Sequence, residues 1–252
     1  MIPKIIHFSW ISGDPYPPLV EKCLKSWEKF APDYEIMHWD KDRFDIQSLL
    51  FTRQAYEHKR WAFIADVQRL YALYMYGGIY LDSDVELVKP LDDFLNNVGF
   101  IGFEGENSLS TGVIGCEKGH PWIKRLLDYY DDLPFIDADG SLYNISNAAT
   151  TSEISKQEFG FDPTKKNQII AGNIRVYPQA CFSPKSLYTW KIEPTADTHA
   201  IHHFACSWVS KKDKWLIKKQ QFKNKIAMMT TRLFGDRFTA ILFSIKRKLF
   251  FK

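Results

Sequence analysis

One stretch of this chain constrains its fold more than any other: a helical pattern, a pair of glycines and a short apolar run in direct succession. Apolar side chains recur at helical spacing over residues 60–76, which predicts an amphipathic helix with one face in the core. The residues of that face are Phe63, Val67, Leu70 and Tyr74. Gly77 and Gly78 predict a glycine cap that ends the helix, and residues 79–81 predict a strand.

Two aspartates directly follow this predicted strand. Side chains alternate between the two faces of a strand, so Asp82 and Asp84 are expected to point the same way. Two carboxylates held together are costly unless a cation or a shared proton relieves their repulsion. Oxygen ligands suit Mg²⁺, Ca²⁺ and Mn²⁺, and such ions keep positions open for phosphate oxygens. The pair therefore indicates a metal–diphosphate site, with a solvated turn as the alternative.

A second charged pair lies on the preceding helix. Asp66 and Arg69 are three positions apart, which makes them neighbours on a face different from the apolar one. The glycine turn between helix and strand is expected to bring this pair to one cleft with Asp82 and Asp84. The alternative is an ordinary ion pair on the helix surface.

These residues carry a resemblance to a known family. The pattern Ala65-Asp66-x-x-Arg69 followed by Gly77-Gly78-Ile79-Tyr80-x-Asp82-x-Asp84 resembles the signature of glycosyltransferase family 32. Residues 2–10 are similar to the first strand of that family, and residues 200–208 resemble its closing strand. The family includes capsular-polysaccharide sugar transferases, yeast-type mannosyltransferases and, more distantly, glucosylating bacterial toxins.

The resemblance implies a fold, a reaction and a set of residue roles. The fold is the GT-A nucleotide-diphosphate-binding fold, and the reaction is retaining transfer of a sugar from a nucleotide donor, helped by Mn²⁺ or Mg²⁺. Asp84 is then the most direct metal ligand, Asp82 contacts the donor ribose and metal-bound water, and Asp66 and Arg69 hold sugar hydroxyls. These four are the expected catalytic residues. The further donor-binding residues that the resemblance implies are Phe8, Trp10, Tyr80, Ser207 and Trp208.

The closing strand offers a third metal ligand, because a neutral imidazole is a normal ligand of Mn²⁺. His202 keeps the better register with the family and is favoured, while the adjacent His203 points to the opposite face and stays the alternative. A pair of one core and one surface histidine is the remaining interpretation. On the acceptor side we expect Glu104, Asn107 and Ser110. The chain departs from the family at Thr111, where many relatives have asparagine.

Length and composition are those of a single α/β domain. With 252 residues, 45% of them hydrophobic, the chain can bury one sizeable core. Alternating strand and helix patterns predict a mixed, mainly parallel sheet flanked by helices over residues 1–208. Strands are expected at residues 4–8, 34–39, 79–81, 98–103, 112–116, 169–170, 174–177 and 199–204, and helices at residues 17–30, 53–58, 60–76, 119–130 and 144–158.

The remaining composition predicts a cytoplasmic protein. Four cysteines are scattered without the spacing of a zinc site, which predicts reduced thiols. Neither a signal-peptide pattern nor an apolar run of about twenty residues is found in the sequence.

Charge is unevenly distributed along the chain. Residues 209–252 carry 13 Lys and Arg against 2 Asp, a net charge of +11, which leaves −8 on residues 1–208. Apolar residues interleave with these lysines at helical spacing, which predicts basic amphipathic helices suited to an anionic membrane surface. The alternative is a set of helices packed on the catalytic body. Because that body is acidic and shows no recognition module, we expect no nucleic-acid partner.

We therefore predict a glycosyltransferase, peripheral on the inner face of the cell membrane, that moves a hexose from a nucleotide-diphosphate sugar to a glycan acceptor. UDP-sugars such as UDP-galactose or UDP-glucose are the favoured donors, with GDP-mannose as the alternative. The expected acceptor is a capsule or surface polysaccharide, and a lipid-linked glycan is one form of it.

One rival belongs to another reaction class. Residues 81–85 also resemble the nucleophile motif of haloacid-dehalogenase-type phosphatases, with Asp82 as the nucleophile. That motif normally ends the first strand of its fold, whereas two strands and two helices are expected before it here.

Overall fold

The computed structural model contains the helix, the glycine turn and the strand predicted for residues 60–81. Helix α3 (Trp61–Tyr76) is followed by strand β3 (Gly78–Leu81). Gly77 and Gly78 have φ angles of +68° and +106°, which side chains other than glycine rarely adopt. A Cβ atom at Gly78 would also lie 2.7 Å from the Ile5 carbonyl oxygen. The double glycine is therefore required both by backbone conformation and by the close approach of β1 (Ile5–Ser9).

The structure describes residues 1–105, 107–186 and 190–205. Residues 1–185 and 192–205 form one compact unit. A second unit comprises residues 186–191 and 206–252, and in its described part the Trp190 N–H donates to the Ser186 carbonyl. The domain boundary and the basic helices that we predict after residue 208 lie outside the described residues.

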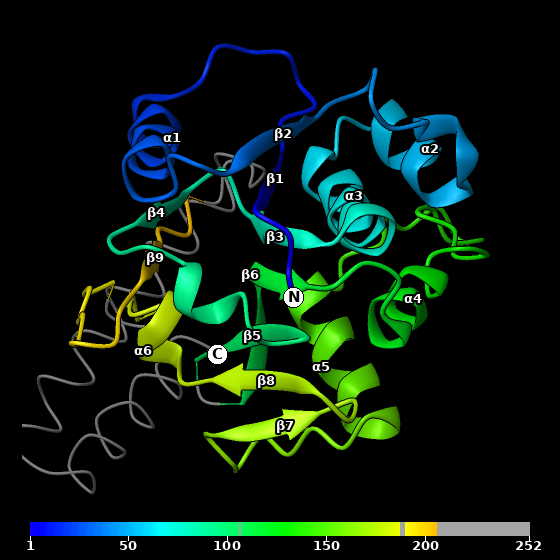
Figure 1. Ribbon diagram of the computed structural model, residues 1–252. Helices are drawn as coiled ribbons and strands as arrows, with labels where there is room; N and C mark the ends of the chain where they lie inside the picture. The colour runs from blue at the N-terminus through cyan, green and yellow to red at the C-terminus, as the bar shows by residue number, and fades with distance from the viewer. Residues whose placement is uncertain (106, 187–189, 206–252) are drawn as a thin grey trace, which may run out of the picture. The chain divides into compact units, whose positions relative to one another are not determined.

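The first unit alternates strands and helices along the chain (Figure 1). Its helices are α1 (Pro18–Phe30), α2 (Leu50–Glu57), α3, α4 (Pro121–Asp128), α5 (Asn147–Glu158) and α6 (Gln179–Phe182). Its strands are β1, β2 (Glu35–Trp39), β3, β4 (Val85–Leu87), β5 (Gly99–Glu104), β6 (Ser108–Cys116), β7 (Gln168–Ile170), β8 (Ile174–Tyr177) and β9 (Ala200–His202). β4 and α6 were not predicted from the sequence; they are only three and four residues long.

Seven strands form the central sheet in the order β2-β1-β3-β6-β5-β8-β7. β1 pairs parallel with β2 and β3, and β5 pairs parallel with β8. β6 runs antiparallel to both β3 and β5, so β2, β1, β3, β5 and β8 all run in one direction. β7 is antiparallel to β8. The predicted α/β class, with a mixed and mainly parallel sheet flanked by helices, is confirmed.

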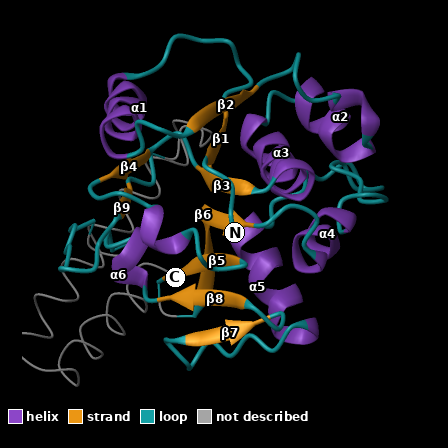
Figure 2. Ribbon diagram, viewed as in Figure 1, coloured by secondary structure: helices purple, strands orange, loops and turns teal. Residues whose placement is uncertain are grey.

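Helices cover both faces of this sheet (Figure 2). Helices α2, α3, α4 and α5 lie on one face, where Tyr80 of β3 and Ile114 of β6 point into a core with Leu70 of α3. Helices α1 and α6 lie on the other face, where Ile79 and Leu81 of β3 enter a second core. β3 is buried on both faces, which accounts for its continuous apolar sequence.

A separate two-stranded sheet pairs β4 with β9 in antiparallel register. In this register Val85 lies opposite His202. The pairing brings the predicted closing strand next to the residues that follow Asp84. The strand is shorter than the expected residues 199–204, since it spans only the three residues Ala200–His202.

Candidate active site

The two aspartates lie on a tight turn between β3 and β4, not on a strand. β3 ends at Leu81, and the Val85 N–H donates to the Asp82 carbonyl at 2.9 Å, which closes the turn. We expected both side chains to point the same way because side chains alternate along a strand. That reason is wrong, because neither aspartate belongs to a strand. The turn nevertheless directs both carboxylates toward the same histidine.

That histidine is His202 of β9. Its Nε2 atom lies 3.4 Å from Oδ1 of Asp84 and 3.7 Å from Oδ2 of Asp82. One potential ligand atom from each of the three residues falls within 4.8 Å of the others. Two carboxylates and one imidazole suit a hard or borderline divalent cation such as Mn²⁺ or Mg²⁺. The side chains thus fit the metal that the sequence analysis expects.

His203 points away from this cluster. Its Nε2 atom lies 2.8 Å from Oε2 of Glu86, which also accepts a hydrogen bond from Lys22 at 2.7 Å. The His203 backbone N–H donates to the Asp84 carbonyl at 3.0 Å. Of the two candidate histidines, only His202 is placed beside both aspartates.

The electrostatics of the cluster are those of a charged triad. Burial disfavours the imidazolium of His202, but the charge of Asp84 and a hydrogen bond to it raise the pKa of His202 to about 9. Burial likewise opposes ionisation of Asp84, yet His202 and the N–H of Ala205 lower the pKa of Asp84 to about 2. Without a metal, a proton on His202 offsets part of the charge of the two carboxylates. A divalent cation would have to displace that proton, because only a neutral imidazole is a ligand.

Arg69 joins helix α3 to this turn. Its Nη2 atom donates to Oδ1 of Asp82 at 2.6 Å, and its Nη1 atom donates to Oδ1 of Asp66 at 3.0 Å. The guanidinium lies 4.6 Å from the ring centroid of Tyr80, and Arg69 is only 3% exposed. Asp66 and Arg69 are therefore part of the same cluster as Asp82, rather than a surface ion pair. Burial raises the pKa of Asp66 to about 7, an effect that Arg69 opposes and Asp82 reinforces.

Asn147 belongs to this network and was not predicted from the sequence. Its Oδ1 atom accepts from Nη1 of Arg69 at 2.9 Å, and its Nδ2 atom donates to the Tyr130 hydroxyl at 2.9 Å. Asn147 is 4% exposed. A signal was present in the sequence, because polar residues form a stripe at helical spacing on the buried face of α5. These residues are Asn147, Thr150, Thr151 and Ser155.

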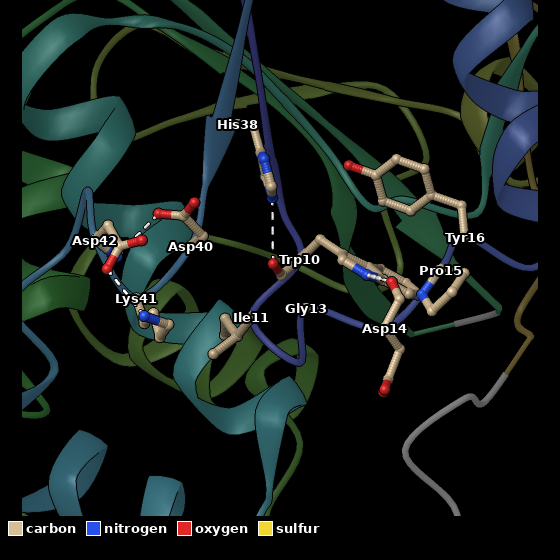
Figure 3. A pocket seen from close by; sticks show the side chains of 10 residues that line it. All are labelled: Trp10, Ile11, Gly13, Asp14, Pro15, Tyr16, His38, Asp40, Lys41 and Asp42. Atoms are coloured by element: carbon tan, nitrogen blue, oxygen red, sulfur yellow. Dashed lines mark hydrogen bonds and ion pairs between the residues drawn. The ribbon is translucent and has the colours of Figure 1, made fainter.

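A cavity of about 370 Å³ opens at the carboxyl ends of β1 and β2 (Figure 3). Its volume is in the range of small-molecule sites. Trp10, Tyr16, His38 and Asp40 are among the residues that line it. The Trp10 indole N–H donates to the Asp14 carbonyl at 2.7 Å, and His38 lies 3.2 Å from the Trp10 carbonyl. β1 is parallel to β3, so this cavity and the aspartate turn lie at the same edge of the sheet.

Gln68 links the cavity to the Arg69 cluster. Its Oε1 atom accepts from the Ser9 hydroxyl at the end of β1, and its Nε2 atom donates to the Asp40 carbonyl at 3.1 Å. Gln68 is fully buried and precedes Arg69 on α3. One helix therefore holds the cavity wall through Gln68 and the aspartate turn through Arg69.

The other expected site residues vary in position. Phe8 is buried beneath the cavity wall, where it stacks on His38 with ring centroids 4.8 Å apart. Glu104 is half-buried at the end of β5; burial raises its pKa, and Asp82 adds to this effect while His202 opposes it. Ser110 is buried, and Asn107 is exposed in the turn between β5 and β6. Ser207 and Trp208 lie outside the described residues.

Two further findings concern the cysteines and the helices. Cys23, Cys116 and Cys181 are buried free thiols, as we predict for reduced cysteines. In the part of the chain that the structure describes, no helix combines the length and the apolar character that crossing a bilayer requires.

Comparison with known proteins finds similarity to glycosyltransferases. Residues 17–100 match the family model described as "Glycosyltransferase sugar-binding region containing DXD motif". Inositol phosphoceramide mannosyltransferase 3 of Schizosaccharomyces pombe is 33% identical over 132 residues, which are 50% of this chain and 36% of that protein. The uncharacterized glycosyltransferase L373 of Acanthamoeba polyphaga mimivirus is 29% identical over 82% of this chain and 84% of that protein.

A solved glycosyltransferase involved in glycosylation of the major capsid of PBCV-1 aligns with 88% of this chain and 98% of its own, at 15% identity and a TM-score of 0.45. The chain spans only about a third of the length of the fission yeast mannosyltransferase. The matched segment contains the Asp66–Arg69 pair and the aspartate turn. The similarity to a glycosyltransferase sugar-binding region that contains a DXD motif therefore extends over residues 17–100.

Proposed function

We propose that this chain is a metal-dependent glycosyltransferase that moves a hexose from a nucleotide-diphosphate sugar to a glycan acceptor. One observation carries the proposal. Asp82, Asp84 and His202 present three potential metal ligands within 4.8 Å of one another, and the two aspartates lie inside the region, residues 17–100, that matches a sugar-binding DXD family. Asp82 and Asp84 are half-buried and Asp82 is paired with Arg69, which argues against an ordinary solvated turn.

Each part of the donor has a matching part of the site. The cavity at Trp10 and His38 has the size and the aromatic lining for a nucleoside. Asp82, Asp84 and His202 would hold Mn²⁺ or Mg²⁺, which supplies positive charge to the diphosphate leaving group. Asp66 and Arg69 would hold hydroxyl groups of the sugar. The family resemblance further implies retention of configuration at the sugar.

The transferred sugar is the finer part of the proposal. The sequence analysis favours UDP-hexoses. The name of the fission yeast relative specifies mannose, and a Saccharomyces cerevisiae relative, 31% identical over 56% of this chain, is named mannosyl phosphorylinositol ceramide synthase CSH1. GDP-mannose therefore joins UDP-glucose and UDP-galactose as a donor to test.

The acceptor and the location are proposals from the sequence. A capsule or surface glycan, lipid-linked or free, follows from the resemblance. The basic segment 209–252 would bring the enzyme to an anionic membrane surface on the cytoplasmic side. Replacing Lys211, Lys212 and Lys214 by Gln in the full chain should weaken cosedimentation with phosphatidylserine vesicles. Unchanged cosedimentation would contradict the membrane proposal and leave the transferase proposal intact.

Donor turnover tests the activity directly. The full-length protein is incubated with Mn²⁺ and each nucleotide sugar, and release of nucleoside diphosphate is measured with and without EDTA. We expect release from one donor, suppressed by EDTA and by Asp84→Asn. Asp132→Asn, at an exposed aspartate in the turn after α4, is the matched control. Absence of release from every donor, or release that EDTA leaves unchanged, would contradict the proposal.

The phosphatase alternative is not supported. Asp82, the nucleophile it requires, is engaged by Arg69 through Oδ1 and faces His202 through Oδ2. It follows β3 rather than the first strand of the sheet. The matched family and the relatives are glycosyltransferases.

A further inference from the structure

His202 lacks the hydrogen bond that normally orients a metal-binding histidine. Such a residue almost always donates its second ring N–H to a carboxylate, a carbonyl or a water, which fixes the ring and its tautomer. In the described part of the chain, Nδ1 of His202 is buried and has no hydrogen-bond partner. Nε2 faces the two aspartates. Within the described protein, packing around the ring must therefore do what a hydrogen bond from Nδ1 would otherwise do.

Phe204 packs against this ring. The centroids of the His202 and Phe204 rings are 4.0 Å apart, with 35° between the ring planes. Phe204 is 9% exposed, so its ring is removed from water together with the imidazole. Gly112 of β6 provides a second contact: a Cβ atom there would lie 2.7 Å from Nδ1 of His202. The imidazole is thus confined by an aromatic ring and by a backbone without a side chain.

The backbone of Phe204 is strained in a way that serves the same site. Its φ angle is +50°, in the left-handed region that a bulky residue adopts only when its surroundings force it. Directly after this turn, the Ala205 N–H donates to Oδ2 of Asp84 at 2.6 Å. Oδ1 of Asp84 is the atom nearest to His202. The turn therefore holds one oxygen of Asp84 and leaves the other facing the metal position.

We infer that Phe204 is a positioning residue for the metal site, which acts by packing on His202 in place of the missing hydrogen bond. This inference rests on the metal site of the proposed function. Phe204 contributes no ligand atom itself. Its ring fixes the imidazole, and its left-handed backbone places Ala205 on Asp84.

Four substitutions separate the ring from the backbone turn. Phe204→Ala removes the ring and keeps the backbone cost. Phe204→Gly removes the ring but adopts the left-handed conformation easily, so the Ala205–Asp84 hydrogen bond persists. Phe204→Tyr and Phe204→Trp retain an aromatic ring. Phe44→Ala is the matched control, because Phe44 is a buried ring that packs on Tyr71 in the core beside α3.

The readout is binding of Mn²⁺ to the full chain without nucleotide, followed by the electron paramagnetic resonance signal of free Mn²⁺ and by calorimetry. Loss of a residue that orients a ligand typically weakens metal binding by about 10–100-fold. We expect a loss of about 10-fold for both Phe204→Ala and Phe204→Gly, wild-type affinity for Phe204→Tyr, and no change for Phe44→Ala. Thermal denaturation should show Phe204→Gly to be more stable than Phe204→Ala.

Three results would overturn the inference, and they are distinguishable. Wild-type affinity in both Phe204→Ala and Phe204→Gly would refute the positioning role and leave the proposed function standing. Loss in Phe204→Ala with full affinity in Phe204→Gly would assign the effect to the backbone turn alone and refute the role of the ring. A wild-type protein that binds no Mn²⁺ would refute the metal site and the inference together.

Discussion

Nη2 of Arg69 lies 2.6 Å from Oδ1 of Asp82, so the first aspartate of the DXD turn is bound to the helix that precedes it in sequence. The same guanidinium holds Asp66 and Asn147. Asp82 therefore has one oxygen committed to the protein and one that faces His202. This division leaves one oxygen of Asp82 for the proposed metal.

Removing Arg69 should destabilise the fold. Arg69→Met leaves Asp66 and Asp82 as neighbouring acids without their buried cation, and breaking a buried pair in this way costs about 3–5 kcal/mol of unfolding free energy. Urea denaturation measures the change. Arg125→Met is the control, because its ion pair with Glu158 is exposed and contributes about 1 kcal/mol or less. Equal losses of unfolding free energy in the two variants would contradict the role of Arg69 as the buried partner of both acids.

Asp84→Asn should weaken Mn²⁺ binding more than any variant that only orients a ligand. The substitution removes a charged ligand atom, so we expect a loss of more than about 100-fold, above the range for orienting residues. Isothermal titration calorimetry gives the dissociation constants. Binding within a factor of two of the wild type would show that Asp84 is not a ligand.

Both hydrogen bonds of Asn147 should contribute to the stability of the fold and to donor turnover. Asn147→Ala leaves a buried Arg69 donor unpaired, which costs about 1–3 kcal/mol, and donor turnover should fall with it. Asn147→Asp keeps an acceptor for Arg69, and the Tyr130 hydroxyl can then donate, so this variant should retain more stability than the alanine variant. Asn144→Ala, at an exposed position before α5, serves as the control. The opposite order of the Asp and Ala variants would be inconsistent with this network.

Gly112→Ala tests the space beside His202. The new Cβ atom displaces the imidazole, so we expect Mn²⁺ affinity to fall by about 10-fold or more. Gly102→Ala on β5 is the matched control, because its Cβ atom would lie 2.8 Å from Phe182 instead. That variant should lose stability while keeping its affinity for Mn²⁺. If Gly102→Ala lost affinity for Mn²⁺ and Gly112→Ala kept it, the space beside His202 would not be what Mn²⁺ binding requires.

The buried His7 should make the stability of the fold depend on pH, independently of the metal site. Burial lowers the pKa of His7 to about 4. The Gly77 carbonyl, 2.7 Å away, needs a proton on Nε2, while Nδ1 lies 3.2 Å from the Trp39 indole N–H and must accept from it. Protonation would therefore set two donors against each other.

The unfolded chain binds this proton near pH 6.5 and the folded chain only near pH 4, so stability is complete above pH 6.5 and falls as the pH drops toward 4. Between pH 7 and pH 5 the loss amounts to about 2 kcal/mol. Urea denaturation of the wild type and of His7→Gln at both pH values isolates this contribution. An equal change of unfolding free energy with pH in both proteins would contradict the contribution of His7.

Local patterns made most of the fold predictable. Continuous apolar runs, helical spacing and the double glycine located α3 and β3 correctly. The short β4 was not predicted, because three residues carry no periodicity that could be recognised. The reason given for the direction of Asp82 and Asp84 was wrong because β3 ends at Leu81 and a turn follows.

The site was predictable only where its residues belong to a contiguous motif. Asp66, Arg69, Asp82 and Asp84 lie within one segment, and register with the family indicated His202. Asn147, Gly112 and Phe204 act through tertiary contacts with residues distant in sequence. No local pattern shows that Gly112 must leave room for an imidazole, or that Phe204 has a left-handed backbone.

The pairing of β9 with β4 also determines when the site can be completed. During synthesis both acids of the turn leave the ribosome long before His202 does, and the strand that carries the histidine is only three residues long. Such a late, long-range pairing closes slowly and opens readily compared with the central sheet. Amide hydrogens of β9 should consequently exchange with solvent faster than those of β3, and occupancy by a cation would be what slows them.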